Sequence, residues 1–143
     1  NDNIENFAQS ERIAKKFGSI DLACLPYAGF GAYPMSYDSL NKEQKKAAHK
    51  KKVAQAQDNF VKYIQTIKPN YVVPFAGEVL MGGPIKVPVY AADGSGIGTK
   101  LACVENAKKK VDCNYLLMSP GCSFDFKTET FSGEFVVNNY KEH

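Results

Sequence analysis

The run Ile20-Asp-Leu-Ala-Cys-Leu25, which ends at Pro26, and the later run Tyr71-Val-Val-Pro-Phe75 decide the fold. Both runs are short and almost entirely apolar, which is typical of strands buried inside a parallel sheet. The residues between them predict one long helix over about residues 39–67. The order strand, helix, strand predicts parallel pairing through a right-handed crossover.

The connecting helix is predicted to carry two kinds of surface. Asp38 or Ser39 caps it, and the segment Lys42 to Lys52 holds six lysines and one glutamate. Only the second half has an apolar stripe, formed by Val53, Phe60, Ile64 and Ile67. We therefore expect only the later turns to pack on a core. The basic first half, in which His49 is expected to face solvent, is either a solvated face or a surface that attracts an anion.

The remaining segments extend the α/β pattern. Helices are predicted over Ile4–Phe17 and near Thr99–Lys110, and strands over Val87–Tyr90, Asn114–Met118, Ser123–Thr128 and Glu134–Asn138. There are no repeats and no low-complexity linker, so residues 1–143 are expected to form a single segment of mostly parallel strands flanked by helices.

Length and composition indicate a globular protein. The chain has 143 residues, of which 44% are hydrophobic and 23% charged. It has neither an apolar stretch of the length a membrane helix needs nor a secretory signal, so no membrane association is expected. Because the sequence begins Asn1-Asp2-Asn3 without a methionine, we interpret it as processed, trimmed or a fragment.

Charge argues against a nucleic-acid partner. Lysine and arginine exceed the acidic residues by 18 to 15, but Arg12 is the single arginine. Proteins that grip nucleic acid usually spread positive charge over a face and use arginine for bidentate contacts. Nucleic acid is therefore not an expected partner.

The four cysteines, Cys24, Cys103, Cys113 and Cys122, form no Cys-x-x-Cys pair and have no histidine nearby in sequence. This spacing excludes a zinc finger. We expect free, reduced thiols, which suit a cytoplasmic protein. A catalytic cysteine is disfavoured because the only histidines are His49 and His143.

Two glycine-rich stretches are candidate sites. The stretch from Tyr27 to Tyr37 is rich in glycine and tyrosine, and loops of this length tend to be functional. The stretch Asp93 to Gly98 matches neither the dinucleotide-binding spacing nor a P-loop, so a surface loop is favoured over a phosphate-binding turn.

Four segments together resemble a known family: Asn1-Asp2-Asn3 before a helix, Phe17-Gly-Ser-Ile-Asp-Leu-Ala23, the loop Pro26 to Tyr37, and Pro74-Phe-Ala-Gly77. They are similar to the second half of the metallo-β-lactamase fold, and most similar to its CMP-N-acetylneuraminate hydroxylase branch. Many hydrolases of this superfamily carry Pro-x-His where this chain has Ala76, and this difference favours the hydroxylase branch.

The resemblance implies a fold, a cofactor and site residues. The fold would be the second half of an αββα sandwich with a mixed sheet, whose metal-binding first half is absent. Asp2 would hold a divalent metal, zinc or iron, together with histidines of that half. Gly29, Gly31, Tyr33 and Pro34 would line the substrate pocket. Phe75, Ala76 and Gly77 would shape it.

The implied function is that of the C-terminal part of a metal-dependent hydrolase or hydroxylase, inactive as this fragment. Its substrate would be a small molecule, such as an anionic sugar or nucleotide. Exposed sheet surface would favour self-association or pairing with the missing half. The alternative is a non-catalytic module that binds a sugar or nucleotide through Tyr27, Tyr33 and Tyr37. A His-x-His-x-Asp-His motif upstream would favour the enzyme.

The resemblance leads to a prediction about metal binding. Asp2 is one ligand, whereas catalytic zinc sites use about three protein ligands. We therefore expect these 143 residues alone to bind Zn²⁺ or Fe²⁺ weakly and to show no hydrolase or hydroxylase activity. Isothermal titration calorimetry with Zn²⁺ measures this. A stoichiometric site of micromolar affinity that Asp2→Ala removes would contradict it.

Overall fold

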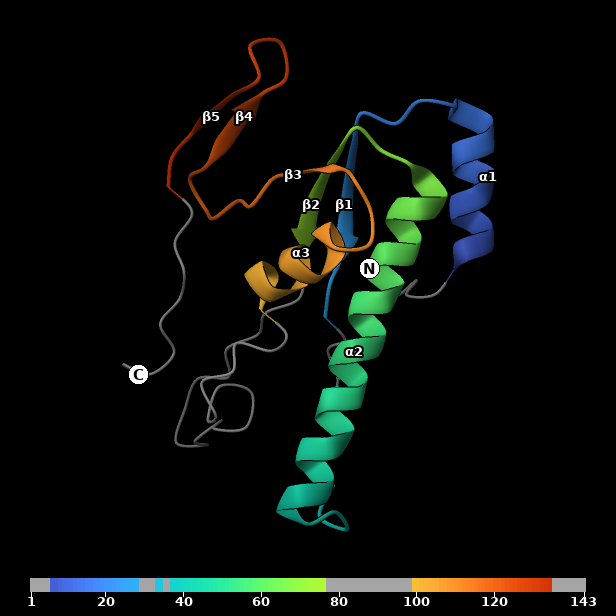
Figure 1. Cartoon of the computed structure of the whole chain (residues 1–143), viewed down its shortest axis with the longest axis vertical. Helices are drawn as coiled ribbons and strands as arrows, with labels where there is room; N and C mark the ends of the chain where they lie inside the picture. The colour runs from blue at the N-terminus through green and yellow to red at the C-terminus, as the bar shows by residue number, and fades with distance from the viewer. Residues whose placement is uncertain (1–5, 29–32, 35–36, 77–98, 135–143) are drawn as a thin grey trace.

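A three-stranded parallel sheet forms the centre of the fold (Figure 1). The computed structural model describes residues 6–28, 33–34, 37–76 and 99–134. The strands are β1 (Leu22–Pro26), β2 (Tyr71–Phe75) and β3 (Asn114–Tyr115), side by side in that order. The helices are α1 (Phe7–Phe17), α2 (Lys42–Ile67) and α3 (Lys100–Lys108), and β4 (Ser123–Asp125) pairs with β5 (Thr130–Ser132) in an antiparallel hairpin. The chain is thus a mixed α/β protein.

The parallel pairing of β1 with β2 runs along both strands. Leu22 lies opposite Tyr71 at one end and Pro26 lies opposite Phe75 at the other. β3 continues the sheet with a short parallel pair that matches Asn114 to Tyr71. The predicted strand–helix–strand unit with parallel strands is confirmed.

The helices pack on one face of the sheet. Crossovers between parallel strands have one preferred hand, so strands that follow in the order β1, β2, β3 place both crossover helices on the same side. On that side Ala23, Leu25 and Val72 are buried with residues of α2 and α3. α1 joins through Phe7, whose ring centroid lies 4.6 Å from that of Tyr63. The buried core residues of the two crossover helices are Phe60, Val61, Tyr63, Ile64, Cys103 and Ala107.

The start of α2 is set by a capping box. Asn41 accepts a hydrogen bond from the backbone N–H of Gln44, and the Gln44 side chain accepts one from the Asn41 N–H, both at 2.9 Å. The expectation of a cap at Asp38 or Ser39 is therefore wrong by a few residues. Although α2 has 26 residues, neither it nor any other helix in the described ranges is long and apolar enough to cross a membrane.

The strands near the end of the described chain are shorter than the sequence predicts. The strand predicted over Ser123–Thr128 is a hairpin, because the Asp125 carboxylate accepts hydrogen bonds from the N–H groups of Lys127 (2.8 Å) and Thr128 (3.2 Å) and turns the chain. The returning strand β5 has three residues, too few to show an alternating pattern. The strand predicted over Asn114–Met118 has only two residues. The segments 87–90 and 135–138 lie outside the described residues.

The core assignment predicts a difference between two isoleucines. Ile64 is 2% exposed, so Ile64→Val should lower the free energy of unfolding by about 0.5–1.5 kcal/mol, because it removes a buried methylene group. Ile13 of α1 is 40% exposed, and Ile13→Val should change the free energy of unfolding by less than about 0.5 kcal/mol. Urea unfolding measures both. Equal losses in the two variants would contradict the placement of Ile64 at the centre of the core.

Candidate functional site

The carboxyl ends of β1 and β2 lie next to each other at one edge of the sheet, the place where open α/β folds bind ligands. Tyr27 follows β1 directly but is 1% exposed and belongs to the core. Tyr27 therefore serves packing, although the sequence also offers it as a ligand contact. Phe75, the last residue of β2, is 55% exposed, and the exposed Ala76 has a left-handed backbone with φ of 52°.

The neighbouring residues Tyr33 and Pro34 lie in different environments, one at the surface and the other buried. Pro34 is fully buried, whereas Tyr33 is 45% exposed, and a cis peptide bond joins them. The Tyr33 ring meets the ring of Tyr37 edge to face, with centroids 5.1 Å apart and an angle of 86° between the planes. Two partly exposed rings thus lie together, and one of them is joined directly to a buried proline.

Lys52 of α2 fixes the backbone of the same segment. Its Nζ donates a 2.9 Å hydrogen bond to the carbonyl oxygen of Tyr33, nineteen positions away in sequence. Burial lowers the pKa of Lys52. The half-buried positions of this part of α2 recur at helical spacing, at Lys45, Ala48, His49 and Lys52, with Val53 buried beyond them. His49, expected to face solvent, is thus half-buried.

The amino-terminal half of α2 extends past the carboxyl edge of the sheet (Figure 1). Every buried residue of α2 lies at Val53 or later, as the sequence predicts. Four lysines of the first half, Lys42, Lys46, Lys50 and Lys51, are exposed. The exposed lysines therefore form a solvated cationic surface on the helix that holds Tyr33.

Four of the predicted site residues cannot be placed. Asp2, Gly29, Gly31 and Gly77 lie outside the described residues, as does the glycine-rich stretch 93–98. Of the others, Tyr33 and Phe75 present exposed rings, Ala76 is exposed, and Pro34 is buried. The sequence analysis did not single out Lys52 from the other lysines, and so it missed the hydrogen bond between Lys52 and Tyr33. The lysine run indicated a basic helix, but its hydrogen bond to Tyr33 joins residues nineteen positions apart, which the sequence pattern does not show.

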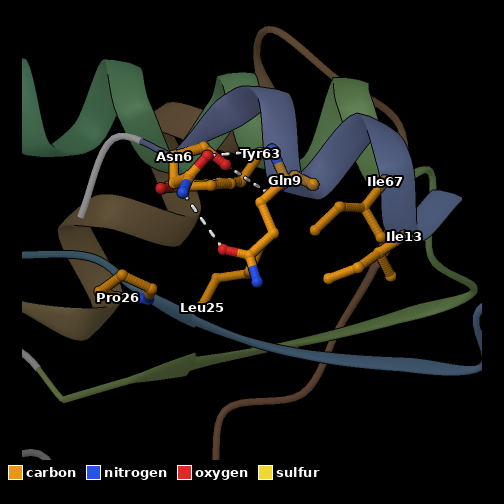
Figure 2. Close-up of a pocket in the computed structure, with 8 residues that line it drawn as sticks. Asn6, Gln9, Ile13, Leu25, Pro26, Tyr63 and Ile67 are labelled. Carbon is orange, nitrogen blue, oxygen red and sulfur yellow. Dashed lines mark hydrogen bonds between the residues drawn. The ribbon is translucent and has the colours of Figure 1, made fainter. Parts of the chain in front are cut away.

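A shallow pocket of about 230 Å³ lies between α1, α2 and β1 (Figure 2). Its lining is Asn6, Gln9, Ser10, Ile13, Leu25, Pro26, Tyr63 and Ile67. The polar groups are engaged with one another: the Asn6 side chain accepts from the Gln9 N–H at 3.0 Å, and Ser10 Oγ donates to the Asn6 carbonyl oxygen at 3.3 Å. These bonds cap α1, and the lining carries no charged side chain, so the pocket is poorly suited to an anionic ligand.

The described residues do not form a metal site. Across 6–28, 33–34, 37–76 and 99–134, no group of three or more His, Cys, Asp or Glu side chains could hold a metal ion. Ala76 has no donor atom in its side chain. The groups that the described part of the carboxyl edge offers are therefore aromatic rings and ammonium groups.

The cysteines are free thiols in different environments. Cys103 is buried, and this burial raises its pKa to about 12. Burial also raises the pKa of Cys113, which is half-buried beside β3. Cys24 is exposed on β1. A thiol with a raised pKa is a poor nucleophile at neutral pH, so Cys103 and Cys113 are structural.

Fold and site together define a mixed α/β protein with a parallel sheet covered by helices on one face. No family model, no curated protein and no solved structure matches the chain. The likeness to the metallo-β-lactamase superfamily therefore rests on the quoted residues, and the activity it implies is treated below as a proposal.

The thiol environments predict a labelling order. In the native chain at neutral pH and low protein concentration, 5,5′-dithiobis(2-nitrobenzoic acid) should modify Cys24 quickly and Cys103 only after unfolding, because Cys103 is buried and its thiolate is disfavoured. Mass spectrometry of proteolytic peptides measures the order. Labelling in denaturant is the control, in which both residues should react. Fast native labelling of Cys103 would contradict its burial.

Proposed function

We propose that this chain binds a small anionic molecule of the sugar or nucleotide type at the carboxyl edge of the parallel sheet. The observation that carries the proposal is the hydrogen bond from Lys52 to the Tyr33 carbonyl oxygen, because it holds two partly exposed tyrosine rings beside a run of exposed lysines. Rings and ammonium groups are complementary to the two chemical parts of such a ligand.

The tyrosine rings supply an apolar contact surface with hydrogen-bonding tips. A sugar or a base stacks on an aromatic face, and a stacked base contributes about 1–3 kcal/mol when measured by alanine substitution. Because Pro34 is buried and Lys52 holds the Tyr33 carbonyl oxygen, Tyr33 is held in place before a ligand arrives. Such preorganisation reduces the entropic cost of binding.

The lysines supply the attraction for an anion. The chain has a net charge of +3, and six of its lysines fall between Lys42 and Lys52. A cluster of one sign raises the local concentration of an oppositely charged small molecule. Lysine acts as a mobile point charge and is suited to a phosphate or a carboxylate without fixed bidentate geometry.

In the full protein, this binding region would serve a metal-dependent hydrolase or hydroxylase. The support for this second step is the resemblance of the quoted segments, in which Asp2 and residues outside this chain would hold zinc or iron. The chain's own contribution would be to bind and orient the substrate through Tyr33, Tyr37 and the lysines. A purely ligand-binding role needs the same contacts and no metal.

The test uses CMP as the probe and cytidine as its uncharged counterpart. We expect isothermal titration calorimetry to show CMP binding that Tyr33→Ala weakens by at least about fivefold, because a stacking surface is lost. Phe17→Ala, which removes an exposed ring (61%) at the end of α1, is the control and should not change the affinity. Since Tyr33 is 45% exposed, the melting temperature should change by only a few degrees, given that about 1 kcal/mol shifts it by roughly 2–8 °C.

The lysine contribution is tested separately with two double variants. Lys46→Gln with Lys50→Gln should weaken CMP binding and leave cytidine binding unchanged. Lys108→Gln with Lys109→Gln removes the same charge at the end of α3 and should leave both unchanged. Equal binding of CMP and cytidine, or equal loss in the two double variants, would refute the anion site. An unchanged Kd in Tyr33→Ala would refute the role of the ring.

A further inference from the structure

One face of the parallel sheet is apolar, and none of the described helices packs on it. The side chains that point away from the helices alternate with the buried ones, and in β1 and β2 they form three cross-strand pairs. These pairs are Leu22 with Tyr71, Cys24 with Val73, and Pro26 with Phe75. None of the six side chains carries a charge at neutral pH. Leu22 is 38% exposed and Phe75 is 55% exposed, and Cys24 is also exposed.

Such a face is unusual for a parallel sheet. Parallel sheets occur almost only with both faces covered, and their strands then read as continuous apolar runs. β1 and β2 have that sequence pattern, yet the helices of the described residues cover only the side of Ala23, Leu25 and Val72. A sheet made to face water on one side would instead alternate apolar and polar residues. The composition of the open face therefore indicates that something packs on it.

The hairpin of β4 and β5 extends this apolar surface. Tyr71 contacts Phe124 and Phe126, with ring centroids 5.1 Å and 5.4 Å away, and its hydroxyl donates to Glu129 at 2.7 Å. Phe131 lies opposite Phe124 across the hairpin. Phe126 and Phe131 are 47% and 41% exposed. The hairpin thus covers Tyr71 at one end of the sheet and adds exposed rings beside it.

We propose that the open sheet face, made by Leu22, Cys24, Val73 and Phe75, is the interface of a homodimer in which a second copy of the chain packs face to face. Two-fold symmetry brings the same patch onto itself, so an isologous patch must be self-complementary. An apolar face whose paired side chains carry no charge meets this condition, because it brings no like charges together. The two sheets then lie against each other with the helices outside.

The charge distribution favours a second copy over a charged partner. The exposed lysines of α2 belong to a helix that packs on the opposite face of the sheet, so they point away from the contact. Two identical chains that carry the same net charge can therefore approach through the open face without bringing like charges together. A strongly acidic or basic partner would find no complementary charge among the six paired side chains of this face.

The size of the surface predicts a weak to moderate dimer. Exposed apolar patches of several hundred Å² mark interaction sites, whereas a standard stable interface buries about 800 Å² from each partner. The described sheet has two strands of five residues and one of two, so its open face is small against that area. Assembly should therefore depend on protein concentration within the range that is accessible in solution.

Sedimentation equilibrium of the full chain, with a reducing agent to prevent Cys24 disulfides, tests the proposal. We expect a reversible monomer–dimer equilibrium that Leu22→Asp and Phe75→Asp each weaken by more than about tenfold, since each places a charge in the apolar contact. Phe17→Asp adds the same charge at a ring that is 61% exposed on α1, and the dimer should persist. Circular dichroism checks that all variants remain folded.

The outcomes separate this proposal from ligand binding. Leu22 lies at the opposite end of β1 from the proposed ligand site, so loss of the dimer in Leu22→Asp with unchanged CMP affinity supports a distinct interface. A monomer at every concentration would overturn the proposal and indicate that another segment or another protein covers the face. A dimer that survives both substitutions, or one that Phe17→Asp also removes, would overturn it as well.

Discussion

The parallel pairing of β1 with β2 is the constraint on which the rest of the structure depends. Parallel neighbours cannot be joined by a tight turn, so the chain must return along the sheet through a crossover element, here α2. The preferred hand of such crossovers, applied again at α3, places the helices on one side. One pairing choice thus creates a covered face with the core, an open face on the other side, and a carboxyl edge where two strand ends meet.

The length of α2 links the core to the candidate site. A helix of 26 residues is about 39 Å long, whereas a strand of five residues spans about 17 Å. The helix therefore extends well past the sheet, and only its second half finds apolar partners. Its first half can remain cationic, because a solvated lysine run has no desolvation cost. Lys52 lies where the two halves meet, and there it reaches the Tyr33 carbonyl oxygen.

Sequence reasoning identified the strongly patterned parts of the fold and missed what depends on tertiary contact. β1, β2, their parallel pairing and the packed half of α2 follow from apolar runs and helical spacing. The hairpin did not, because its turn depends on hydrogen bonds that the Asp125 carboxylate accepts, and its strands are too short to show a pattern. In the site, Tyr33 and Phe75 are both exposed, and their contact with a ligand stays a prediction. Tyr27 and Tyr33 belong to the same tyrosine-rich loop, yet one is core and the other surface, which composition cannot distinguish.

Phe75 borders both the carboxyl edge and the open sheet face. Burial of its ring stabilises packing on the sheet face more than ligand binding at the edge. Burying the exposed half of a phenylalanine ring removes roughly 100 Å² of apolar surface from water, about 2–3 kcal/mol at 25 cal/mol per Å². A sheet packed against this ring would cover it fully, whereas a ligand held by Tyr33, Tyr37 and lysines gains little from a third ring on β2. The side chain of Phe75 alternates with Pro74, which is buried under the helices, so it points to the face opposite α2 and its lysines. The position of Phe75 on β2 therefore suits packing against a second layer. The proposed ligand contacts come instead from Tyr33, Tyr37 and the lysines of α2, on the other side of the sheet.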